Sequence, residues 1–318
     1  MKVMVFDVGG TEIKYSVMDE QLNRADAGSV PTPDDTQEHF LATLEALYRP
    51  HAAEVDGIAM SLPGFIDAEH GVVRGGGAPS LLYNIGTPVG PLLSARCGCR
   101  VFLENDGKAA AIAELQQGAL KGCTNGAVFV IGTGVGGGVI IDGKLFEGFE
   151  SKGAELGHMV IVKDGEPCGC GRRGCMEAYC SANALIRDTK RAMKENKQSA
   201  MWQFVDGDIN KVDGRVAFEC SKTGDPAAKE VIDNYVAYLG EGLSNFINIF
   251  RPQAIILGGG VCAQGDYLVV PVQKYTDEHT YGGGRAPRTL ILTATLGNDA
   301  GLIGAASLAI SKLGKKVK

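Results

Sequence analysis

The stretch that decides the fold is K-V-M-V-F-D-V-G-G-T-E-I-K-Y-S-V, residues 2–17. An apolar run before the small-residue turn at 7–11 and an alternating run after it predict two strands of a hairpin. Glycines at such a tip let backbone N–H groups approach a phosphate closely, while Thr11 offers a hydroxyl and Lys14 a positive charge. The same residues also suit an ordinary tight turn, so both interpretations stay open at this point.

A second stretch of the same kind is V-F-V-I-G-T-G-V-G-G-G-V-I-I, residues 128–141. Three of its glycines match the spacing of a dinucleotide-binding fingerprint, but that fingerprint opens a helix, whereas here a strand follows and turns at 142–143. Two halves that each carry such a hairpin would place two phosphate-binding tips across one cleft. The repeat predicts an α/β protein with the two-domain actin-like ATPase (ribonuclease H-like) fold and an active-site cleft between the domains.

The chain of 318 residues is long enough for two domains of ordinary size. We expect a smaller N-terminal α/β domain formed by residues 1–118 plus 300–318, and a larger α/β domain formed by residues 119–299. Apolar periodicity predicts helices at 36–49, 177–196, 226–250 and 299–313, strands at 57–62, 100–103 and 254–257, and an irregular loop at 71–91.

Composition narrows the class of protein. A hydrophobic content of 45% with 21% charged residues is typical of a soluble globular chain. The formal net charge of -6 argues against a nucleic-acid partner, and no apolar segment approaches the roughly 20 residues that span a bilayer. We therefore expect a cytoplasmic protein without a membrane partner, in a reducing compartment where clustered cysteines bind metal.

A cysteine-rich loop lies at residues 155–177, with the sequence E-L-G-H-M-V-I-V-K-D-G-E-P-C-G-C-G-R-R-G-C-M-E. His158, Cys168, Cys170 and Cys175 are ligand types for zinc, and the glycines between the cysteines exclude a regular helix or strand. Buried apolar cysteines or a disulfide are the alternatives, but no apolar run surrounds the cluster and a disulfide would leave one of the three cysteines unpaired. Three thiolates and one imidazole leave no open position, so the predicted zinc is structural.

Two carboxylates flank this loop. Folding the loop around one ion would bring Glu155 and Glu177 close to His158, which predicts a substrate pocket held together by the metal.

A third group of polar residues follows the strand at 100–103. Asp106 could cap the helix that starts here, or it could act as a catalytic base at a strand end, where open α/β sheets bind ligands. The neighbouring Asn105 favours the second interpretation, because one cap would suffice for the helix.

Together these motifs resemble those of the ROK family of sugar kinases and regulators. The resemblance covers nearly the whole chain and rests on D-V-G-G-T at 7–11, E-N-D at 104–106, G-T-G-V-G-G-G at 132–138, E-L-G-H at 155–158, C-G-C-G-R-R-G-C-M-E at 168–177 and L-G-G-G-V at 257–261. Any one glycine motif is weak, whereas the ordered set is specific.

The resemblance implies an ATP-dependent hexose kinase that transfers the γ-phosphate of ATP to a sugar hydroxyl, with glucose O6 as the first choice and Asp106 as the general base. The sugar-binding residues it implies are Gly64, Asn105, Asp106, Glu155, His158 and Glu177. The nucleotide-binding residues it implies are Asp7, Gly9, Gly10, Thr11, Lys14, Gly132, Thr133, Gly134, Gly259 and Gly260. It further implies ATP with Mg²⁺ near Asp7, a structural Zn²⁺, and a homodimer.

Other members of the family remain alternatives. Kinases for N-acetylmannosamine, fructose or a β-glucoside fit the same motifs, and the Asn-x-x-Trp element of many family glucokinases is missing, since the sole tryptophan is Trp202. The glycine-rich stretch 75–77 resembles that of β-glucoside kinases. A sugar-responsive regulator is disfavoured, because the regulators carry a helix-turn-helix domain before the first strand and the first glycine turn here begins at residue 7.

Overall fold

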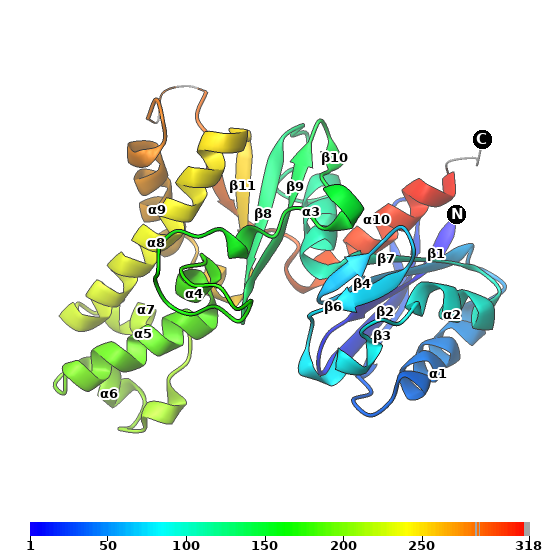
Figure 1. The fold of residues 1–318 in the computed structure, drawn as a ribbon, viewed down its shortest axis with the longest axis horizontal. Coiled ribbons are helices and arrows are strands. Elements are labelled where there is room, and N and C mark those ends of the chain that lie inside the picture. Colours follow the sequence, from blue (N-terminus) through cyan, green and yellow to red (C-terminus); the bar gives the residue numbers. More distant parts are fainter. Residues whose placement is uncertain (284, 286, 315–318) are drawn as a thin grey trace. The chain divides into compact units, whose positions relative to one another are not determined.

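The computed structural model describes residues 1–283, 285 and 287–314, so residues 315–318 of the predicted N-terminal domain lie outside the described residues. The chain divides into two compact units (Figure 1). Unit 1 comprises Met1–Gly122, Gly138–Ala154 and the chain from Thr295 on, and unit 2 comprises Cys123–Gly137 and Glu155–Ala294. Neither unit is a single continuous piece of chain.

Unit 1 is built on a five-stranded sheet with the order β3-β2-β1-β4-β7. The pairs β1–β2 and β2–β3 are antiparallel, whereas β1–β4 and β4–β7 are parallel. The strand bounds are Lys2–Val8 for β1, Glu12–Asp19 for β2, Arg24–Pro31 for β3, Gly57–Leu62 for β4 and Arg100–Asn105 for β7. The hairpin, the parallel strand 57–62 and the strand from residue 100 that the sequence predicts are all present.

Both faces of this sheet are buried, because β1 alternates between two cores. Met4, Phe6 and Val8 belong to a core with helices α1 and α2, while Val3 and Val5 belong to a second core with helix α10. Figure 1 shows α1 and α2 on the side of the sheet opposite α10. The helices of unit 1 are α1 (Gln37–Tyr48), α2 (Val89–Cys97), α3 (Asp106–Gln116) and α10 (Ala300–Gly314), with short 3-10 turns at Arg49–His51, Pro79–Asn84, Phe149–Ser151 and Gly297–Asp299.

The second five-stranded sheet has the order β10-β9-β8-β11-β12. Strand β11 runs parallel to both β8 and β12, and β10 is antiparallel to β9. The strand bounds are Gly126–Ile131 for β8, Val135–Ile141 for β9, Lys144–Leu145 for β10, Ala254–Gly258 for β11 and Leu290–Thr293 for β12. The order repeats that of the first sheet, with β8 in the place of β1 and β9 in the place of β2.

Helix α8 (Pro226–Phe250) is the main support of the unit 2 core. The side chain of Asp225 caps it by accepting from the N–H of Ala228, and Pro226 occupies its first turn. The ring of Phe246 meets Phe129 of β8 edge to face, with centroids 5.5 Å apart. The other helices of unit 2 are α4 (Glu177–Cys180), α5 (Ala182–Glu195), α6 (Ala200–Phe204), α7 (Val216–Lys222) and α9 (Asp266–His279), with 3-10 turns at Leu156–His158, Ile209–Lys211 and Gly260–Gln264.

The predicted irregular loop 71–91 is wrong in part. It contains β6 (Val72–Gly75), which pairs with β5 (Phe65–Asp67) in a small antiparallel sheet, and it also contains the start of α2. Strand β6 has only two apolar residues, Val72 and Val73, which is too little alternation for a sequence pattern to reveal.

The single helix predicted at 177–196 is also wrong. Ser181 is extended (φ -70°, ψ 161°), ends α4 and caps α5 with its side chain.

The predicted domain boundary at residue 118 differs from the boundaries of the two units, because residues 138–154 belong to unit 1. A Cβ on Gly138 would lie 2.7 Å from Cβ of Ala111 on α3, so this part of β9 packs closely on that helix.

Among the described residues, no helix is both long and apolar enough to cross a bilayer.

Candidate active site and metal loop

The first tip, residues 9–11, joins β1 to β2 and follows Asp7. Asp7 lies directly opposite Lys14 in the antiparallel register. Burial raises the pKa of the Asp7 carboxyl above its ordinary value, while the charge of Lys14 opposes the rise. The hairpin therefore presents one carboxylate and one amine side by side at the base of the turn.

The carbonyl groups of the first tip are bound by the protein around them. Thr32 donates its hydroxyl to the carbonyl of Gly9 over 2.7 Å and its N–H to the carbonyl of Thr11 over 3.0 Å. The hydroxyl of Ser80 donates to the carbonyl of Gly10. Because these oxygens are held by protein donors, the tip can offer the N–H groups of Gly10 and Thr11 to an anion without exposing the carbonyls that would repel it. The N–H of Gly9 already donates to the carbonyl of Glu12.

Asn105 and not Asp106 caps helix α3. The side chain of Asn105 accepts from the N–H of Lys108 and donates to the carbonyl of Gly64 over 2.9 Å. Of the two interpretations of Asp106, the N-cap is therefore wrong. Asp106 is the first residue of the helix, and its Oδ1 accepts the neighbouring N–H of Gly107 over 2.8 Å.

The carboxyl of Asp106 has an altered acidity. The residue as a whole is exposed, but the surrounding protein removes much of the bulk water from its carboxyl. This desolvation, followed by the nearby charge of Asp7, raises the pKa of Asp106 to about 6. A carboxylate in this range can exchange a proton near neutral pH.

Gly64 is a glycine for a steric reason. Its φ is +100°, and a Cβ there would lie within 3 Å of the backbone of residues 75–77. The glycine-rich stretch 75–77 thus packs directly against Gly64, whose carbonyl is held by Asn105.

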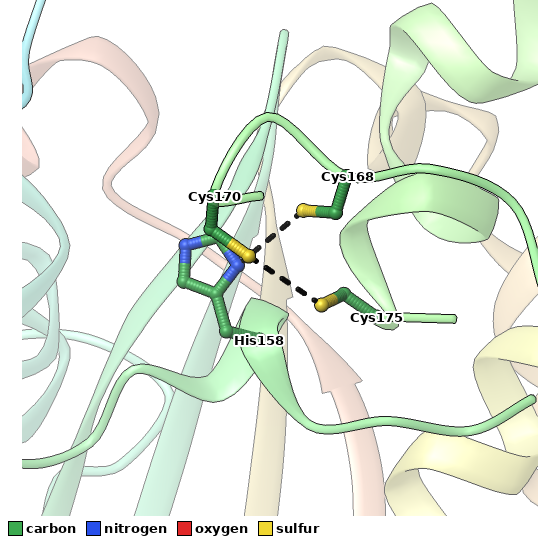
Figure 2. Close-up of side chains that lie close together, drawn as sticks. All are labelled: His158, Cys168, Cys170 and Cys175. Carbon is green, nitrogen blue, oxygen red and sulfur yellow. Dashed lines mark hydrogen bonds between the residues drawn. The ribbon is translucent and has the colours of Figure 1, made fainter. Parts of the chain in front are cut away.

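His158, Cys168, Cys170 and Cys175 come together in unit 2 (Figure 2), and their ligand atoms all lie within 4.8 Å of one another. Nδ1 of His158 is 3.6 Å from Sγ of Cys168, and Sγ of Cys170 is 3.7 Å from Sγ of Cys175. Ligands on a tetrahedral zinc would be separated by about 3.5 Å for nitrogen and sulfur and about 3.8 Å for two sulfurs, from the usual bond lengths. The four side chains therefore fit one tetrahedral ion.

The backbone of the metal loop (residues 155–177) closes this cluster. The N–H of Cys168 donates to the carbonyl of Arg172, and the N–H of Gly174 donates to the carbonyl of Glu166. Gly174 has φ +79°, and a Cβ there would overlap the carbonyl oxygen of Val162 at 1.7 Å. This glycine is required for the turn that carries Cys175.

Glu177 connects the metal loop to the second tip, residues 132–134. Its Oε2 accepts from the N–H of Val135 over 3.0 Å, and its Oε1 lies 3.5 Å from Sγ of Cys168. A Cβ on Gly134 would lie 2.4 Å from the same Oε2. The other side of the tip is held by the N–H of Ala182, which donates to the carbonyl of Gly132.

Gly259 and Gly260, predicted to bind the nucleotide, differ from each other. Gly259 has φ +91°, and a Cβ there would lie 2.2 Å from the carbonyl oxygen of Ile131, so the close approach of β11 to β8 already requires a glycine. A Cβ on Gly260 would meet no atom within 4 Å, which leaves open space beside it.

The predicted residues thus form two sets. Asp7, the first tip, Lys14, Gly64, Asn105 and Asp106 belong to unit 1, while the second tip, Glu155, His158, Glu177, Gly259, Gly260 and the cysteine ligands belong to unit 2.

Sequence reasoning missed two residues of unit 1. Gly301, at the start of α10, lies so close to Asp7 that a Cβ would be 2.2 Å from its Oδ1. Lys108, two residues after Asp106 on α3, is buried. The small-residue character of the last helix was a signal for Gly301, whereas no signal marks Lys108.

Three comparisons bear on the class of the protein. The model of the ROK family matches residues 3–312. A glucokinase of Streptomyces coelicolor is 34% identical over 306 residues, which cover 95% of this chain and 96% of that protein. A β-glucoside kinase of Klebsiella pneumoniae is 30% identical over 307 residues, which cover 96% and 95%.

Among solved structures, a ROK family glucokinase from Streptomyces griseus in complex with glucose and AMPPNP is 33% identical, with a TM-score of 0.81 over 98% of this chain and 100% of that one. The repeated strand order and this likeness define the class as a two-domain actin-like ATPase fold, as predicted. More specifically, the chain belongs to the ROK family.

Proposed function

We propose that this protein is an ATP-dependent sugar kinase that transfers the γ-phosphate of ATP to O6 of glucose. The observation that carries the proposal is Asp106, a carboxylate at a strand end that caps no helix and whose pKa is raised to about 6. Likeness to glucokinases over nearly the whole chain supports the reaction and the acceptor.

Asp106 acts as the general base in this proposal. A sugar hydroxyl is a weak acid, and a nearby carboxylate accepts its proton as the oxygen attacks the phosphorus. A pKa near 6 leaves Asp106 mostly ionised at pH 7.5 and still basic enough to take the proton. Asn105 and Gly64 lie beside it and contribute polar groups for the sugar.

Each tip is assigned by itself to the substrate MgATP. Asp7 is assigned to the Mg²⁺ of the substrate, and Lys14 adds a positive charge. The phosphates are assigned to the backbone N–H groups of Gly10, Thr11, Thr133 and Gly134. The N–H groups of Gly9 and Gly132 already donate to the carbonyls of Glu12 and Gly134. A Cβ on Gly132 would meet no atom within 4 Å, so there is room for a phosphate beside it. Gly259 and Gly260 are assigned to the adenosine.

The metal loop binds one Zn²⁺ through His158, Cys168, Cys170 and Cys175. Zinc supplies a fixed tetrahedral anchor for the loop and performs no step of the reaction. Because Nδ1 of His158 faces the cysteines, its other ring nitrogen is left for a sugar hydroxyl. Glu155 and Glu177 are assigned to the same sugar.

A β-glucoside is the second candidate acceptor. A Cβ on Gly75 would meet no atom within 4 Å, so the stretch that packs on Gly64 leaves open space. A bulky substituent on the sugar could occupy that space. A fructose or N-acetylmannosamine acceptor has no such observation in its favour.

The test is a coupled ATP-consumption assay of the zinc-loaded protein with glucose, fructose, N-acetylmannosamine, N-acetylglucosamine and methyl β-glucoside. Glucose is expected to give the highest kcat/KM. Asp106→Asn should lower kcat by about 10²–10⁴-fold, the usual contribution of a general base, while glucose still binds. Wild-type protein that is folded and metal-loaded but inactive with every sugar would refute the kinase proposal.

The pH profile gives a second check on Asp106. The carboxylate must be unprotonated to act as a base, so kcat/KM should be level above pH 7 and fall about tenfold per unit below pH 6. A profile that stays level down to pH 5 would contradict the assignment.

We also propose that the enzyme is a cytoplasmic homodimer. None of the nine cysteines, all of them among the described residues, is in a disulfide, which suits a reducing compartment. Light scattering coupled to size-exclusion chromatography should give a mass twice that of the chain, and a monomer would contradict the dimer.

A further inference from the structure

The segment of residues 147–154, called here the crossover loop, is strained. Glu150, Ser151 and Ala154 all have positive φ, at 53°, 58° and 65°, although none of them is glycine. Such a conformation is unfavourable for residues with a Cβ and persists only when neighbouring groups hold it. The loop also leaves the ring of Phe149 86% exposed, so it is not kept in place by burying an aromatic side chain.

The crossover loop is closed at its base. The N–H of Gly153 donates to the carbonyl of Glu147 over 2.8 Å, and a Cβ on Gly148 would lie 2.5 Å from Cα of Gly153. These contacts set the ends of the loop. Within the loop itself, its strained centre, Glu150 and Ser151, is spanned by the bond from the N–H of Lys152 to the carbonyl of Phe149, and Nζ of Lys152 pairs with the carboxylate of Glu150.

Lys108 holds that centre. Its side chain is 4% exposed, and Nζ donates to the carbonyl of Ser151 over 2.6 Å. The carboxyl of Glu104, which is 1% exposed and has one oxygen without a hydrogen-bond partner, lies within range of the charges of Lys108 and Glu147. Burying an amine has a desolvation cost, which the hydrogen bond from Nζ to the carbonyl of Ser151 offsets in part.

The loop lies close to the proposed sugar-binding residues of unit 1. Lys108 is two residues after Asp106 on α3. Nζ of Lys152 lies over the ring of Phe65, 5.9 Å from its centroid, and Phe65 follows Gly64. At its other end the loop passes from unit 1 into unit 2 and continues directly into Glu155.

We propose that Lys108 is a positioning residue for the sugar site. It fixes the strained crossover loop through the carbonyl of Ser151 and so sets the start of the segment that carries Glu155. Lys108 contacts neither the sugar nor ATP, and its substitution changes the affinity for the sugar. The proposal rests on the proposed function, in which Glu155 binds the sugar.

The experiment compares Lys108→Met, which keeps the length and removes the donor, with Lys108→Arg, which keeps a donor. Lys108→Met should raise KM for glucose by about tenfold, as expected for loss of a buried side-chain hydrogen bond, with kcat changed less than about threefold. KM for ATP should not change, and Lys108→Arg should retain most of the wild-type KM for glucose. A merely structural loss would lower the active fraction, and therefore the apparent kcat, without changing KM.

A second substitution tests whether Lys108 acts on the crossover loop or on the stability of the whole protein. Glu150→Gly removes the strain of a positive φ at an exposed residue, so the loop conformation should depend less on the hydrogen bond from Lys108. In the Lys108→Met background, Glu150→Gly should recover most of the affinity for glucose. Amide hydrogen exchange of residues 147–156, measured without substrate, should be faster in Lys108→Met and slowed again by Glu150→Gly.

The outcomes distinguish this proposal from the proposed function. An active wild type whose KM for glucose is unchanged by Lys108→Met would overturn the role of Lys108 and leave the kinase in place. A shifted pH profile of kcat with an unchanged KM would also overturn it, because Lys108 would then act on Asp106. If the wild type phosphorylates no sugar, the proposed function fails. Unchanged hydrogen exchange of the crossover loop in Lys108→Met would, independently of that result, refute the claim that Lys108 fixes the loop.

Discussion

The first tip and the second tip have the same length and composition and yet are held in different ways. Each joins the first two strands of its sheet through two glycines and one threonine. In the first, Asp7 and Lys14 flank the turn. The positions that correspond to them in the second are Val130 and Gly137, which carry no charge.

The supports of the two tips also differ. The first tip is held by hydroxyls from unit 1, whereas the second is held by Glu177 and Ala182, which lie at the end of the metal loop and just beyond it. The comparison teaches that one repeated hairpin can provide charge in one copy and neutral N–H groups in the other. It also indicates that the order of the second tip depends on the metal loop.

The largest expected effect tests the charge of the first tip. Asp7→Asn should lower kcat/KM about 10²–10³-fold, because an electrostatic contribution to phosphoryl transfer is lost. Thermal stability should not fall, since burial raises the pKa of Asp7 and so disfavours the charged form that asparagine replaces. Steady-state kinetics and a melting curve measure both.

Asp34→Asn is the matched control for Asp7→Asn, because Asp34 is exposed and should alter neither quantity. Wild-type turnover in Asp7→Asn would contradict the claim that the charge of the first tip distinguishes it from the second.

A smaller effect tests the dependence of the second tip on the metal loop. Cys175→Ala should lose the metal and, through the disordered support of Glu177, raise KM for ATP about tenfold, the equivalent of one charge-assisted hydrogen bond. The melting temperature should fall by more than about 5 °C, because metal binding stabilises the folded loop. Metal content by atomic spectroscopy checks the first step.

Cys123→Ala serves as the control for Cys175→Ala, because Cys123 is a half-buried free thiol outside the metal loop. Full metal content in Cys175→Ala would count against the zinc assignment, and an unchanged KM for ATP in the metal-free protein would show that the second tip stands alone.

The smallest effect is expected from alanine substitutions at the two glycines of the second tip. A Cβ on Gly134 displaces the Glu177 carboxylate, so Gly134→Ala should cost about 1 kcal/mol of stability through the bond from Val135. A Cβ on Gly132 enters open space, so Gly132→Ala should leave the melting temperature unchanged and weaken ATP binding. Calorimetry and nucleotide titration separate the two. Equal melting temperatures for both variants would show that Glu177 does not stabilise the second tip.

The fold was readable from sequence where local signals agreed. The two hairpins follow from strand patterns and glycine turns, and helix α8 follows from Pro226 at its start and unbroken apolar periodicity to Phe250. Strand β6 was missed because two apolar residues carry too little pattern. The break at Ser181 had a signal, since serine before a helical run is a good cap, but continuous periodicity on both sides hid it.

The residues of the candidate site could be predicted from the sequence, but the hydrogen bonds that position them could not. The metal ligands follow from spacing, because the loop that joins them is short. The cap by Asn105, the bond from Val135 to Glu177 and the burial of Lys108 depend on which distant segments pack together. Such contacts are set by tertiary structure, and no local pattern encodes them.

The placement of helix α10 has a consequence for how the protein is made. Leu302, Ala305 and Ala306 pack on Val3 and Val5 of the first strand, so the last described helix completes the core of the first sheet. At ordinary rates of synthesis, roughly 15 to 60 s separate the two segments on the ribosome. During that interval one apolar face of the first sheet lacks its cover, while nearly all of unit 2 has already emerged. A nascent chain stalled before residue 300 should therefore bind holdase chaperones through its N-terminal strands and release them once α10 is made.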